Sequence, residues 1–317
     1  YRLGKVYRWT MSDIVVHKID EVYNKIICER HIAREISEFF TFMVPGYQFT
    51  PSYRNKIWDG KIRLFNLSTL QLYQGLLGYL EEFCDERGYT IDIEDNLDYE
   101  DEFSVYHAKK FIESLNLHSL GKPIQPRDHQ IDAFVHTMQK RKTLLLSPTA
   151  SGKSLIIYLL VRQLLDYQNL KGLIIVPTTS LVTQLCSDFV DYASENDFDV
   201  QNNVHMIYQG KEKQSDKKIV ISTWQSIYKM PKEYFDQYDY VIGDEAHGFK
   251  SQSLTAIMTN SVQTKYRVGL TGTLDGTKTH KLVLEGMFGP VKSVAKTKEL
   301  IDKGDLANFN IKCIVLK

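Results

Sequence analysis

The stretch LLLSPTASGKS, residues 144–154, decides how this chain folds. An apolar run typical of a strand (TLLLS, 143–147) leads into the loop, and a helical run (SLIIYLLVRQLL, 154–165) follows it. The loop ends in the Gly-Lys-Ser order of a phosphate-binding loop, in the strand-loop-helix setting that such a loop requires. Ser147 stands where the usual pattern has its first glycine, but that glycine only eases the turn. The stretch therefore predicts an α/β nucleotide-binding fold.

The side chains of this loop predict a site for ATP and Mg²⁺. Lys153 would reach the β- and γ-phosphates, and the Ser154 hydroxyl would ligate the magnesium ion. Ser151 and Gly152 complete the loop, whose backbone N–H groups and helix N-terminus can surround phosphate oxygens. The alternative is a chance Gly-Lys-Ser at the start of an ordinary helix.

A pair of acids supports the nucleotide interpretation. Asp244 and Glu245 end an apolar run in VIGDEAH, residues 241–247. Because the carboxyl ends of parallel strands open on one edge of a sheet, we expect this pair to face the same phosphates. Asp244 would hold the magnesium through water, and Glu245 would act as general base on the attacking water. The alternative is two acids in a solvated loop.

The chain divides into two predicted domains, 11–120 and 121–317, at the segment GKPIQP. The first reads as a small α+β domain, with a hairpin of IVVHKI and YNKIIC, a helical stretch at ISEFFTFM, a strand at KIRLF and a helix that ends at Gly88. The second has continuous apolar strands between helical segments, which predicts a parallel sheet with helices on both faces. Its strands are predicted at 143–147, 172–177, 218–223, 239–244 and 266–273.

Charge and composition place few limits on function. The formal net charge is zero, with an acidic excess in residues 11–120 and a basic excess in 121–317, so total charge decides nothing about a nucleic-acid partner. The acidic run DIEDNLDYEDE, residues 92–102, is typical of a solvated loop or linker. The four cysteines lack the paired spacing of a disulfide framework or zinc site.

Targeting signals are also missing from the sequence pattern. No apolar run approaches the ~18 residues that a membrane span needs, and no signal-peptide pattern is present. We therefore predict a cytoplasmic protein without a membrane partner. Met11 reads as the native start, so residues 1–10 receive no functional weight.

Five motifs occur in the order and spacing of the first motor domain of superfamily 2 helicases: PTASGKS (148–154), VPTTSLVTQ (176–184), STWQS (222–226), GDEAH (243–247) and LTGT (270–273). The chain resembles this superfamily, in its DEAH-box spelling, over about residues 125–290. The resemblance implies a RecA-like P-loop NTPase domain. Within the superfamily the chain is most similar to phage recombination helicases with a small N-terminal domain, a similarity carried mainly by residues 46–65.

The resemblance also implies roles for individual residues. Gln130 in QPRDHQ matches a glutamine that reads adenine, and a side-chain amide suits adenine's donor and acceptor edge. The alternative is a polar residue on a surface helix. Hydroxyl and amide groups that contact the nucleic-acid backbone in the family correspond to Thr178, Thr179, Thr223 and Gln225. Threonines at such turns also serve as helix caps, which is the alternative here.

Three further residues match positions that link phosphate occupancy to the grip on nucleic acid: His247, Thr271 and Thr273. A histidine after a strand is otherwise a structural residue. Ala150 departs from the family, which usually has glycine there, and reduced nucleotide affinity would follow if its backbone φ had to be positive.

The N-terminal domain carries its own candidate nucleic-acid surface. YRNKIWDGKIRLF, residues 53–65, interleaves cations with aromatic residues, a combination that can meet phosphates and stack on bases. The structural alternative places Trp58 and Phe65 in the core, with a hairpin turn at Asp59 and Gly60. The candidate contact residues are Arg54, Lys56, Trp58, Lys61 and Arg63.

The resemblance implies that the full protein is an ATP-dependent DNA helicase or translocase that remodels branched nucleic acids by junction branch migration, fork regression or RNA-DNA loop unwinding. We expect a monomer that binds DNA, branched or as an RNA-DNA hybrid. An ATP-gated nucleic-acid clamp or annealing module and the motor subunit of a restriction-type complex remain alternatives. The sequence ends near FNIKCIVLK, where a second motor domain is expected to begin, so we expect this chain to be a fragment with weak ATP hydrolysis on its own.

Overall fold

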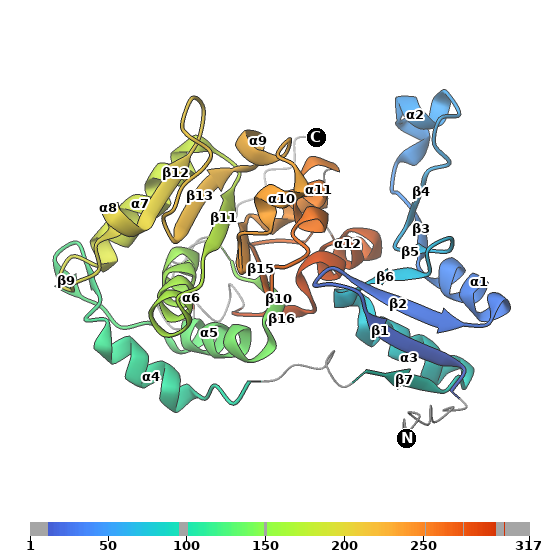
Figure 1. The fold of residues 1–317 in the computed structure, drawn as a ribbon, viewed down its shortest axis with the longest axis horizontal. Coiled ribbons are helices and arrows are strands. Elements are labelled where there is room, and N and C mark those ends of the chain that lie inside the picture. Colours follow the sequence, from blue (N-terminus) through green and yellow to red (C-terminus); the bar gives the residue numbers. More distant parts are fainter. Residues whose placement is uncertain are drawn as a thin grey trace, which may run out of the picture.

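The computed structural model describes residues 12–94, 101–148, 151–250, 252–274, 276–295 and 301. Most of the acidic run and Ala150 lie outside the described residues. Two main sheets, one near each end of the chain, organise the described part (Figure 1). Within it, no helix is long and apolar enough to cross a membrane.

The first sheet has five strands in the order β5-β6-β2-β1-β7. β1 and β2 form the expected antiparallel hairpin, and β7 joins β1 in parallel. Alternate residues of the hairpin, such as Ile14, Val16 and Ile26, pack with α1 and α3 in one apolar core. The elements are β1 (Ile14–Lys18), β2 (Tyr23–Cys28), α1 (Arg30–Phe39), β5 (Phe65–Asn66), β6 (Gln71–Tyr73), η2 (Gln74–Leu76), α3 (Leu77–Arg87) and β7 (Ile91–Ile93).

The sequence predicts the end of α3 and a helical stretch that overlaps α1. Gly88 ends α3 in the left-handed conformation, with φ of 73°, as its position in the sequence predicts. The helical stretch expected at ISEFFTFM is only partly correct, because α1 ends at Phe39 and the next residues form β3 (Thr41–Met43).

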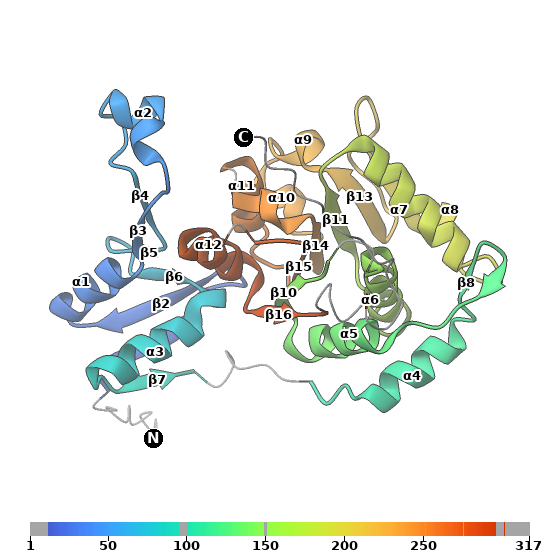
Figure 2. The ribbon, with the colours of Figure 1, turned by 180° about the vertical axis from the view of Figure 1, so that it is seen from behind.

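A two-stranded ribbon projects from the first sheet and carries two short helices at its tip, as both views show (Figure 2). We call residues 41–63 the arm. β3 pairs with β4 (Lys61–Arg63), and between them lie η1 (Tyr47–Phe49) and α2 (Pro51–Arg54).

The predicted hairpin turn at Asp59 and Gly60 is wrong. Thr50 caps α2, and Pro51 occupies the first turn of that helix. The segment before Asp59 is therefore helical where a hairpin would need a strand that pairs with β4. Trp58 is half-buried and lies outside the apolar core, where its Nε1 donates to the Lys61 carbonyl at 2.9 Å. Phe65 is in the core, 1% exposed.

The second sheet confirms the predicted parallel α/β architecture. Its seven strands run parallel in the order β12-β13-β11-β14-β15-β10-β16. The strands predicted from the sequence are all present, and β12 and β16 add the two edges. The strands are β10 (Lys142–Leu146), β11 (Gly172–Val176), β12 (Val204–Ile207), β13 (Ile219–Thr223), β14 (Tyr240–Asp244), β15 (Tyr266–Thr271) and β16 (Val291–Ser293).

Helices cover both faces of this sheet, which is why its strands are apolar throughout. Ile174 and Ile242 pack into one core with α5, α6 and α7, whereas Leu173 and Val241 pack into another on the opposite face. The helices are α5 (Asp128–Lys140), α6 (Lys153–Gln168), α7 (Thr179–Tyr192), α8 (Val200–Asn203), α9 (Trp224–Ile227), α10 (Lys232–Phe235), η3 (Ala246–Lys250), α11 (Gln252–Asn260) and α12 (Lys278–Phe288).

The segment between the two sheets packs with the second one. α4 (Val105–Ser114) places Phe111 against Phe134 of α5, and both rings belong to the core of the second sheet. β8 (His118–Ser119) and β9 (Lys122–Pro123) then form a short ribbon. The domain division at residues 120 and 121 stays a prediction, since α4 precedes it in sequence but packs with helices that follow it.

The first sheet docks tightly on α12 of the second. A side chain at Gly75 in η2 would place its Cβ 1.8 Å from the Glu285 carbonyl oxygen, so only glycine permits this approach. The Tyr79 hydroxyl donates to Glu285 Oε2 at 2.7 Å, and Leu282 of α12 belongs to the core of the first sheet. The two sheets therefore form a continuous packed unit.

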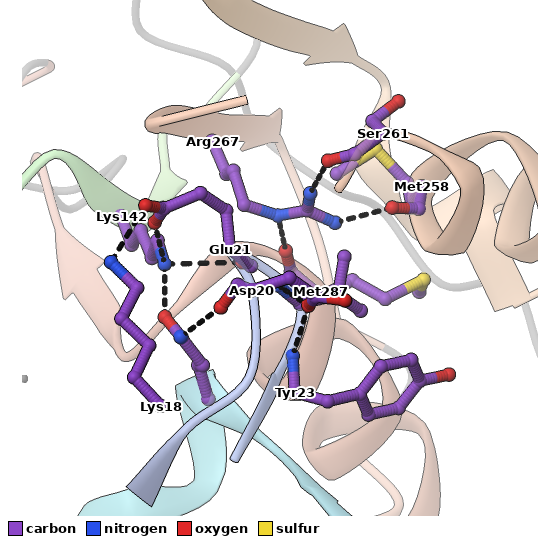
Figure 3. A network of polar contacts seen from close by, with 11 residues as sticks. Lys18, Asp20, Glu21, Tyr23, Lys142, Met258, Ser261, Arg267 and Met287 are labelled. Atoms are coloured by element: carbon purple, nitrogen blue, oxygen red, sulfur yellow. Dashed lines mark hydrogen bonds and ion pairs between the residues drawn. The ribbon is translucent and has the colours of Figure 1, made fainter. Parts of the chain in front are cut away.

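A polar network completes this contact (Figure 3). Glu21, in the β1–β2 turn, accepts from Lys18 Nζ at 2.6 Å and from Lys142 Nζ at 2.8 Å. Beside it, Arg267 is 1% exposed and donates to three main-chain carbonyls. Lys142 begins β10 and Arg267 is the second residue of β15. The network thus lies at the amino ends of the two strands whose opposite ends carry predicted site residues.

Candidate nucleotide and nucleic-acid sites

Three predicted motifs meet at the carboxyl ends of three adjacent strands. The phosphate loop (residues 147–154) follows β10, the acid pair lies at the end of β14, and Thr271 ends β15, which lies between them. The register places Leu146 beside Thr271, and Asp244 beside Leu270. The parallel sheet thus brings together residues that are far apart in the sequence, at the edge where α/β proteins bind their ligands.

Lys153 and Glu245 form the central ion pair of this edge. Lys153 Nζ lies 2.6 Å from Glu245 Oε1. Glu245 has a φ of 52°, a value that is uncommon for a residue other than glycine and is often found at functional sites.

Gly152 caps α6 with a φ of 78°, and a Cβ there would lie 2.1 Å from Gln130 Nε2. The left-handed φ therefore favours glycine beside the lysine, and any other residue would also displace the Gln130 amide.

Asp244 is half-buried, and one of its carboxylate oxygens is sealed from solvent. Its Oδ1 has no hydrogen-bond partner among the described residues. Burial raises the pKa of this carboxyl, the neighbouring Glu245 adds to that effect, and Lys153 opposes it. An orphaned carboxylate oxygen beside a lysine is typical of a site that is completed by a ligand.

The side-chain oxygens of Asp244 and Ser154 are of the type that a magnesium ion binds. Asp244 and Ser154 offer carboxylate and hydroxyl oxygens, which are the ligands that Mg²⁺ prefers. The Ser154 hydroxyl hydrogen-bonds the Tyr192 hydroxyl of α7 at 2.9 Å, so it would have to exchange this contact for a metal. The described residues contain no cluster of three or more histidine, cysteine or acidic side chains that could hold a metal alone. A bound nucleotide would have to supply the remaining oxygen ligands.

Ser147 has a structural role in the phosphate loop. Its hydroxyl lies 2.6 Å from the Ser151 hydroxyl, and Ser151 Oγ in turn donates to the Pro148 carbonyl at 2.6 Å. Both serines are fully buried. Serine at position 147 therefore ties the two ends of the loop together, a function that the usual glycine could not perform.

Gln130 also holds the loop in this structure. Its Nε2 donates to the Ser151 carbonyl at 3.0 Å, and its Oε1 accepts from the Arg127 N–H at 2.8 Å. The side chain is 4% exposed, so Gln130 is not the surface residue of the alternative interpretation. Its role as adenine ligand stays a prediction.

His247 connects the acid pair to the end of β15. Its Nδ1 lies 3.1 Å from Thr271 Oγ1 and 3.3 Å from Glu245 Oε2. Because the Thr271 hydroxyl donates its proton to the Thr273 carbonyl at 2.9 Å, it must accept from the histidine. We infer that Nδ1 carries a proton, and that this N–H group is shared between the Thr271 hydroxyl and the Glu245 carboxylate. The predicted coupling residues thus form a single hydrogen-bonded chain.

The predicted nucleic-acid contacts of the second sheet line one groove of about 610 Å³. Thr178 and Thr179 begin α7, and Thr223 and Gln225 lie at the end of β13 and in α9. Thr178 caps α7 by accepting from the Leu181 N–H at 3.3 Å, as the capping alternative predicts. Thr179, Thr223 and Gln225 do not cap a helix through a side-chain hydrogen bond. The Gln225 side chain donates to the Pro177 carbonyl at 3.4 Å.

The same groove contains residues that sequence reasoning missed. Tyr208, Lys211 and Lys213, from the loop after β12, also line it. Both lysines are exposed, and Lys211 Nζ lies 5.6 Å from the centre of the Tyr208 ring. The signal lies in YQGKEK, residues 208–213, where an aromatic residue, a glycine and two lysines follow a strand. The groove is therefore more cationic than its hydroxyl motifs alone predict.

The candidate residues of the arm do not join this groove. Lys61 and Arg63 alternate with half-buried Ile62 on β4, as strand periodicity predicts, and both are exposed. Arg63 pairs with Asp59, which lowers the pKa of the Asp59 carboxyl to about 2. The tip also exposes Phe49 and Ile57, at 71% and 80%. The remaining candidates in the arm are Arg54 and Lys56, both exposed, and half-buried Trp58.

Comparisons with known proteins agree with the motif series. Residues 123–276 match the family model described as type III restriction enzyme, res subunit, and residues 13–94 match the model of the N-terminal domain of the DNA helicase UvsW. The chain is 34% identical over 305 residues to the ATP-dependent DNA helicase UvsW of phage T4. It is 28% identical over 201 residues to the DNA 3′-5′ translocase XPB2 of Sulfurisphaera tokodaii.

Solved structures give the same result over both sheets. A crystal structure of the T4 UvsW helicase matches with a TM-score of 0.81 and 35% identity, covering 89% of this chain and 99% of that chain. The alignment with the T4 helicase sequence covers 96% of this chain but 61% of the T4 protein, and that with the translocase covers 63% and 42%. This chain thus spans less than two thirds of the length of either relative.

Proposed function

Because the chain belongs to the UvsW-like helicase family, we propose that it forms the ATP-binding part of an ATP-dependent DNA helicase or translocase that remodels branched nucleic acids. The observation that carries the proposal is the pairing of Lys153 with Glu245, 2.6 Å apart, beside the orphaned carboxylate oxygen of Asp244. This arrangement supplies a cation for phosphate, a base for water and an oxygen ligand for a metal.

In the proposed reaction, Lys153 exchanges Glu245 for the phosphates of ATP. Glu245 is thereby released and can accept a proton from the attacking water. Asp244 and Ser154 would hold a magnesium ion, which when bound would neutralise charge on the phosphate oxygens. His247 donates to Thr271 and shares its proton with Glu245, so a change at the acid reaches the end of β15. ATP binding is therefore proposed to rearrange an existing hydrogen-bonded chain.

The groove beside this site is proposed to hold one nucleic-acid strand by its backbone. Among its lining residues, Thr179, Thr223 and Gln225 offer polar groups, and Lys211 and Lys213 offer positive charge. Contacts of this kind position a protein on nucleic acid without reading the bases, which suits a translocase. The arm is proposed to contact a second part of a branched substrate through Arg54, Lys56, Trp58, Lys61 and Arg63.

A turnover experiment tests the motor function. We expect the ATP hydrolysis rate of the full-length protein, with its second motor domain, to rise at least ~10-fold on adding a four-way DNA junction, because nucleic acid in the groove completes the coupled site. An ATP-gated clamp or annealing module would instead change its DNA affinity with nucleotide while turnover stayed flat. Flat turnover on both junction and fork DNA would rule out the motor.

A charge-reversal variant tests the arm. Replacing Lys61 and Arg63 with glutamate should weaken junction binding and reduce the slope of log affinity against log salt by about 2, since two phosphate contacts are lost. The salt dependence is measured by fluorescence anisotropy. Lys229→Glu and Lys232→Glu, on exposed positions of the second sheet's domain outside the groove, form the matched control. An unchanged slope in the arm variant would assign DNA binding to other surfaces.

The match of residues 123–276 to a restriction-enzyme subunit keeps a restriction-type motor as the second candidate. The match of residues 13–94 to the UvsW N-terminal domain favours the recombination helicase instead. Junction branch migration, fork regression and RNA-DNA loop unwinding are the proposed activities. A monomeric state and a cytoplasmic location stay predictions.

A further inference from the structure

The end of the arm, residues 44–60, is a folded element with its own packing, and we call it the tip. The rings of Tyr47 and Tyr53 meet edge to face, with their centres 4.6 Å apart. A Cβ at Gly60 would lie 2.5 Å from the Tyr47 ring, so the returning chain packs directly on that ring. Two N–H groups of the returning chain also donate to the Ser52 carbonyl, at 2.9 and 3.2 Å. The tip is therefore a defined shape at the end of a projecting ribbon (Figure 2).

Two large apolar side chains of the tip remain in solvent. Phe49, in η1, is 71% exposed, and Ile57, just after α2, is 80% exposed. Neither belongs to the apolar core of the first sheet. Single apolar side chains scattered over a surface are ordinary, whereas a local concentration of them indicates a contact surface. The tip thus presents apolar groups to a partner.

The charge of the tip indicates what kind of partner fits. Residues 44–58 contain two cations, Arg54 and Lys56, and no acid. Both cations are exposed, and neither has an ion-pair partner in the part of the chain that the structure describes. The next acid along the chain, Asp59, is already engaged by Arg63. Charge complementarity therefore favours an anionic partner, and the exposed apolar groups require that this partner also offers apolar faces.

Nucleic acid meets both requirements only where its bases are open. In a continuous duplex the base faces are stacked on each other, and apolar side chains reach them by unstacking a step at a cost of a few kcal/mol. This cost is lowest where pairing is already interrupted. A branch point is such a place, because the stack of at least one strand ends there.

We propose that Phe49 and Ile57 form an apolar wedge that packs against unstacked bases at a DNA branch point, while Arg54 and Lys56 contact the flanking phosphates. The proposal rests on the proposed function of the arm and adds a physical reason for a preference for branched over linear DNA. Phosphate contacts alone are the same on both substrates, whereas open base faces are present only on the branched one.

The double variant Phe49→Ala with Ile57→Ala tests the wedge in the full-length protein. We expect its affinity for a four-way junction to fall by ~10-fold, in line with the loss of one base contact. The affinity for a linear duplex of the same sequence should not change. The slope of log affinity against log salt should also stay the same, since no phosphate contact is lost. Fluorescence anisotropy measures all three quantities.

A fluorescent base reports the contact directly. With 2-aminopurine at the branch point, binding of the parent protein should raise the fluorescence, because the base is held unstacked. The alanine variant should give a smaller rise at saturating protein. Phe49→Leu with Ile57→Met keeps apolar side chains of the kind that wedge between bases, so it should retain both the junction preference and most of the signal.

An exposed apolar residue elsewhere provides the matched control. Leu120, in the turn between β8 and β9, is 88% exposed, and Leu120→Ala should leave junction binding unchanged. Because all three side chains are largely in solvent, every variant should keep the Tm of the parent protein, which confirms that the changes in binding are local.

The outcomes separate the wedge from the motor function. Junction affinity and 2-aminopurine signal that are unchanged in the alanine variant would overturn the wedge and favour a protein partner for the tip. An equal loss of affinity on junction and linear duplex would overturn it as well. ATP turnover is a separate readout: flat turnover together with a 2-aminopurine signal that depends on Phe49 and Ile57 would refute the motor and keep the wedge.

Discussion

Replacing Lys153 with alanine should abolish ATP binding, and replacing Glu245 with glutamine should retain binding while lowering DNA-stimulated turnover by a factor of ~10² to 10⁴. The two effects differ because the lysine would contact phosphate in the bound state, whereas the glutamate would act on water only during the reaction. Fluorescent-nucleotide binding and steady-state hydrolysis, measured on the same preparations, distinguish the two variants.

The ion pair between Lys153 and Glu245 also affects how tightly the Glu245→Gln variant should bind nucleotide. In the structure Lys153 is bonded to Glu245 at 2.6 Å, so Glu245→Gln also frees the lysine from a competing partner. We therefore expect equal or tighter nucleotide binding in Glu245→Gln. Lys171→Ala, at a lysine that hydrogen-bonds the Ser215 carbonyl away from this edge, is a suitable control. Normal binding and turnover in Lys153→Ala would show that the nucleotide site is assigned wrongly.

Arg267→Met should be the most destabilising of the substitutions considered for this protein. Arg267 Nε donates to the Met287 carbonyl at 2.7 Å, and its terminal nitrogens donate to the carbonyls of Ser261 and Met258 at 3.0 and 2.8 Å (Figure 3). Methionine keeps the apolar bulk but leaves three buried acceptors unpaired, at ~1 to 3 kcal/mol each. The sum approaches the whole stability of a typical domain, so we expect aggregation or a large fall in Tm.

Thermal unfolding measured by circular dichroism checks this expectation. Arg267→Lys can satisfy only part of the three-carbonyl set and should be intermediate, because an ammonium lacks the planar fork of the guanidinium. Arg30→Met, at an exposed position of α1, is the matched control. Burial lowers the pKa of Arg267 to about 10, so the guanidinium remains charged at neutral pH and keeps all its donors. A Tm for Arg267→Met within a few degrees of the parent would contradict this account.

Much of the second sheet could be predicted from the sequence, because its signals are local. Runs such as GLIIV and YVIGD are apolar without interruption, and only strands covered on both faces need such runs. Each run ends in a polar motif, and parallel strands place all these ends on one edge. Lys153, Asp244 and Thr271 could therefore be assigned to one site from their motifs alone.

The arm was predicted less well, since its local signals conflict. The dipeptide Asp59-Gly60 is typical of a hairpin turn, but Thr50 and Pro51 start a helix where the partner strand would lie. β3 therefore pairs with β4 across an intervening segment that contains η1 and α2, and Trp58 remains outside the core. Lys61 and Arg63 nevertheless share the exposed face of β4, because strand periodicity does not depend on which partner the strand pairs with.

The sequence by itself determined the parallel α/β fold and the grouping of the phosphate loop with the acid pair, because apolar periodicity and strand direction are properties of single segments. Only the tertiary structure decided how the first sheet docks, with Gly75 against the Glu285 carbonyl and Glu21 against Lys142. It also left Phe49 and Ile57 exposed on the folded tip of the arm. Contacts between distant segments depend on shape and charge complementarity over the whole surface, and no local pattern in either segment records them.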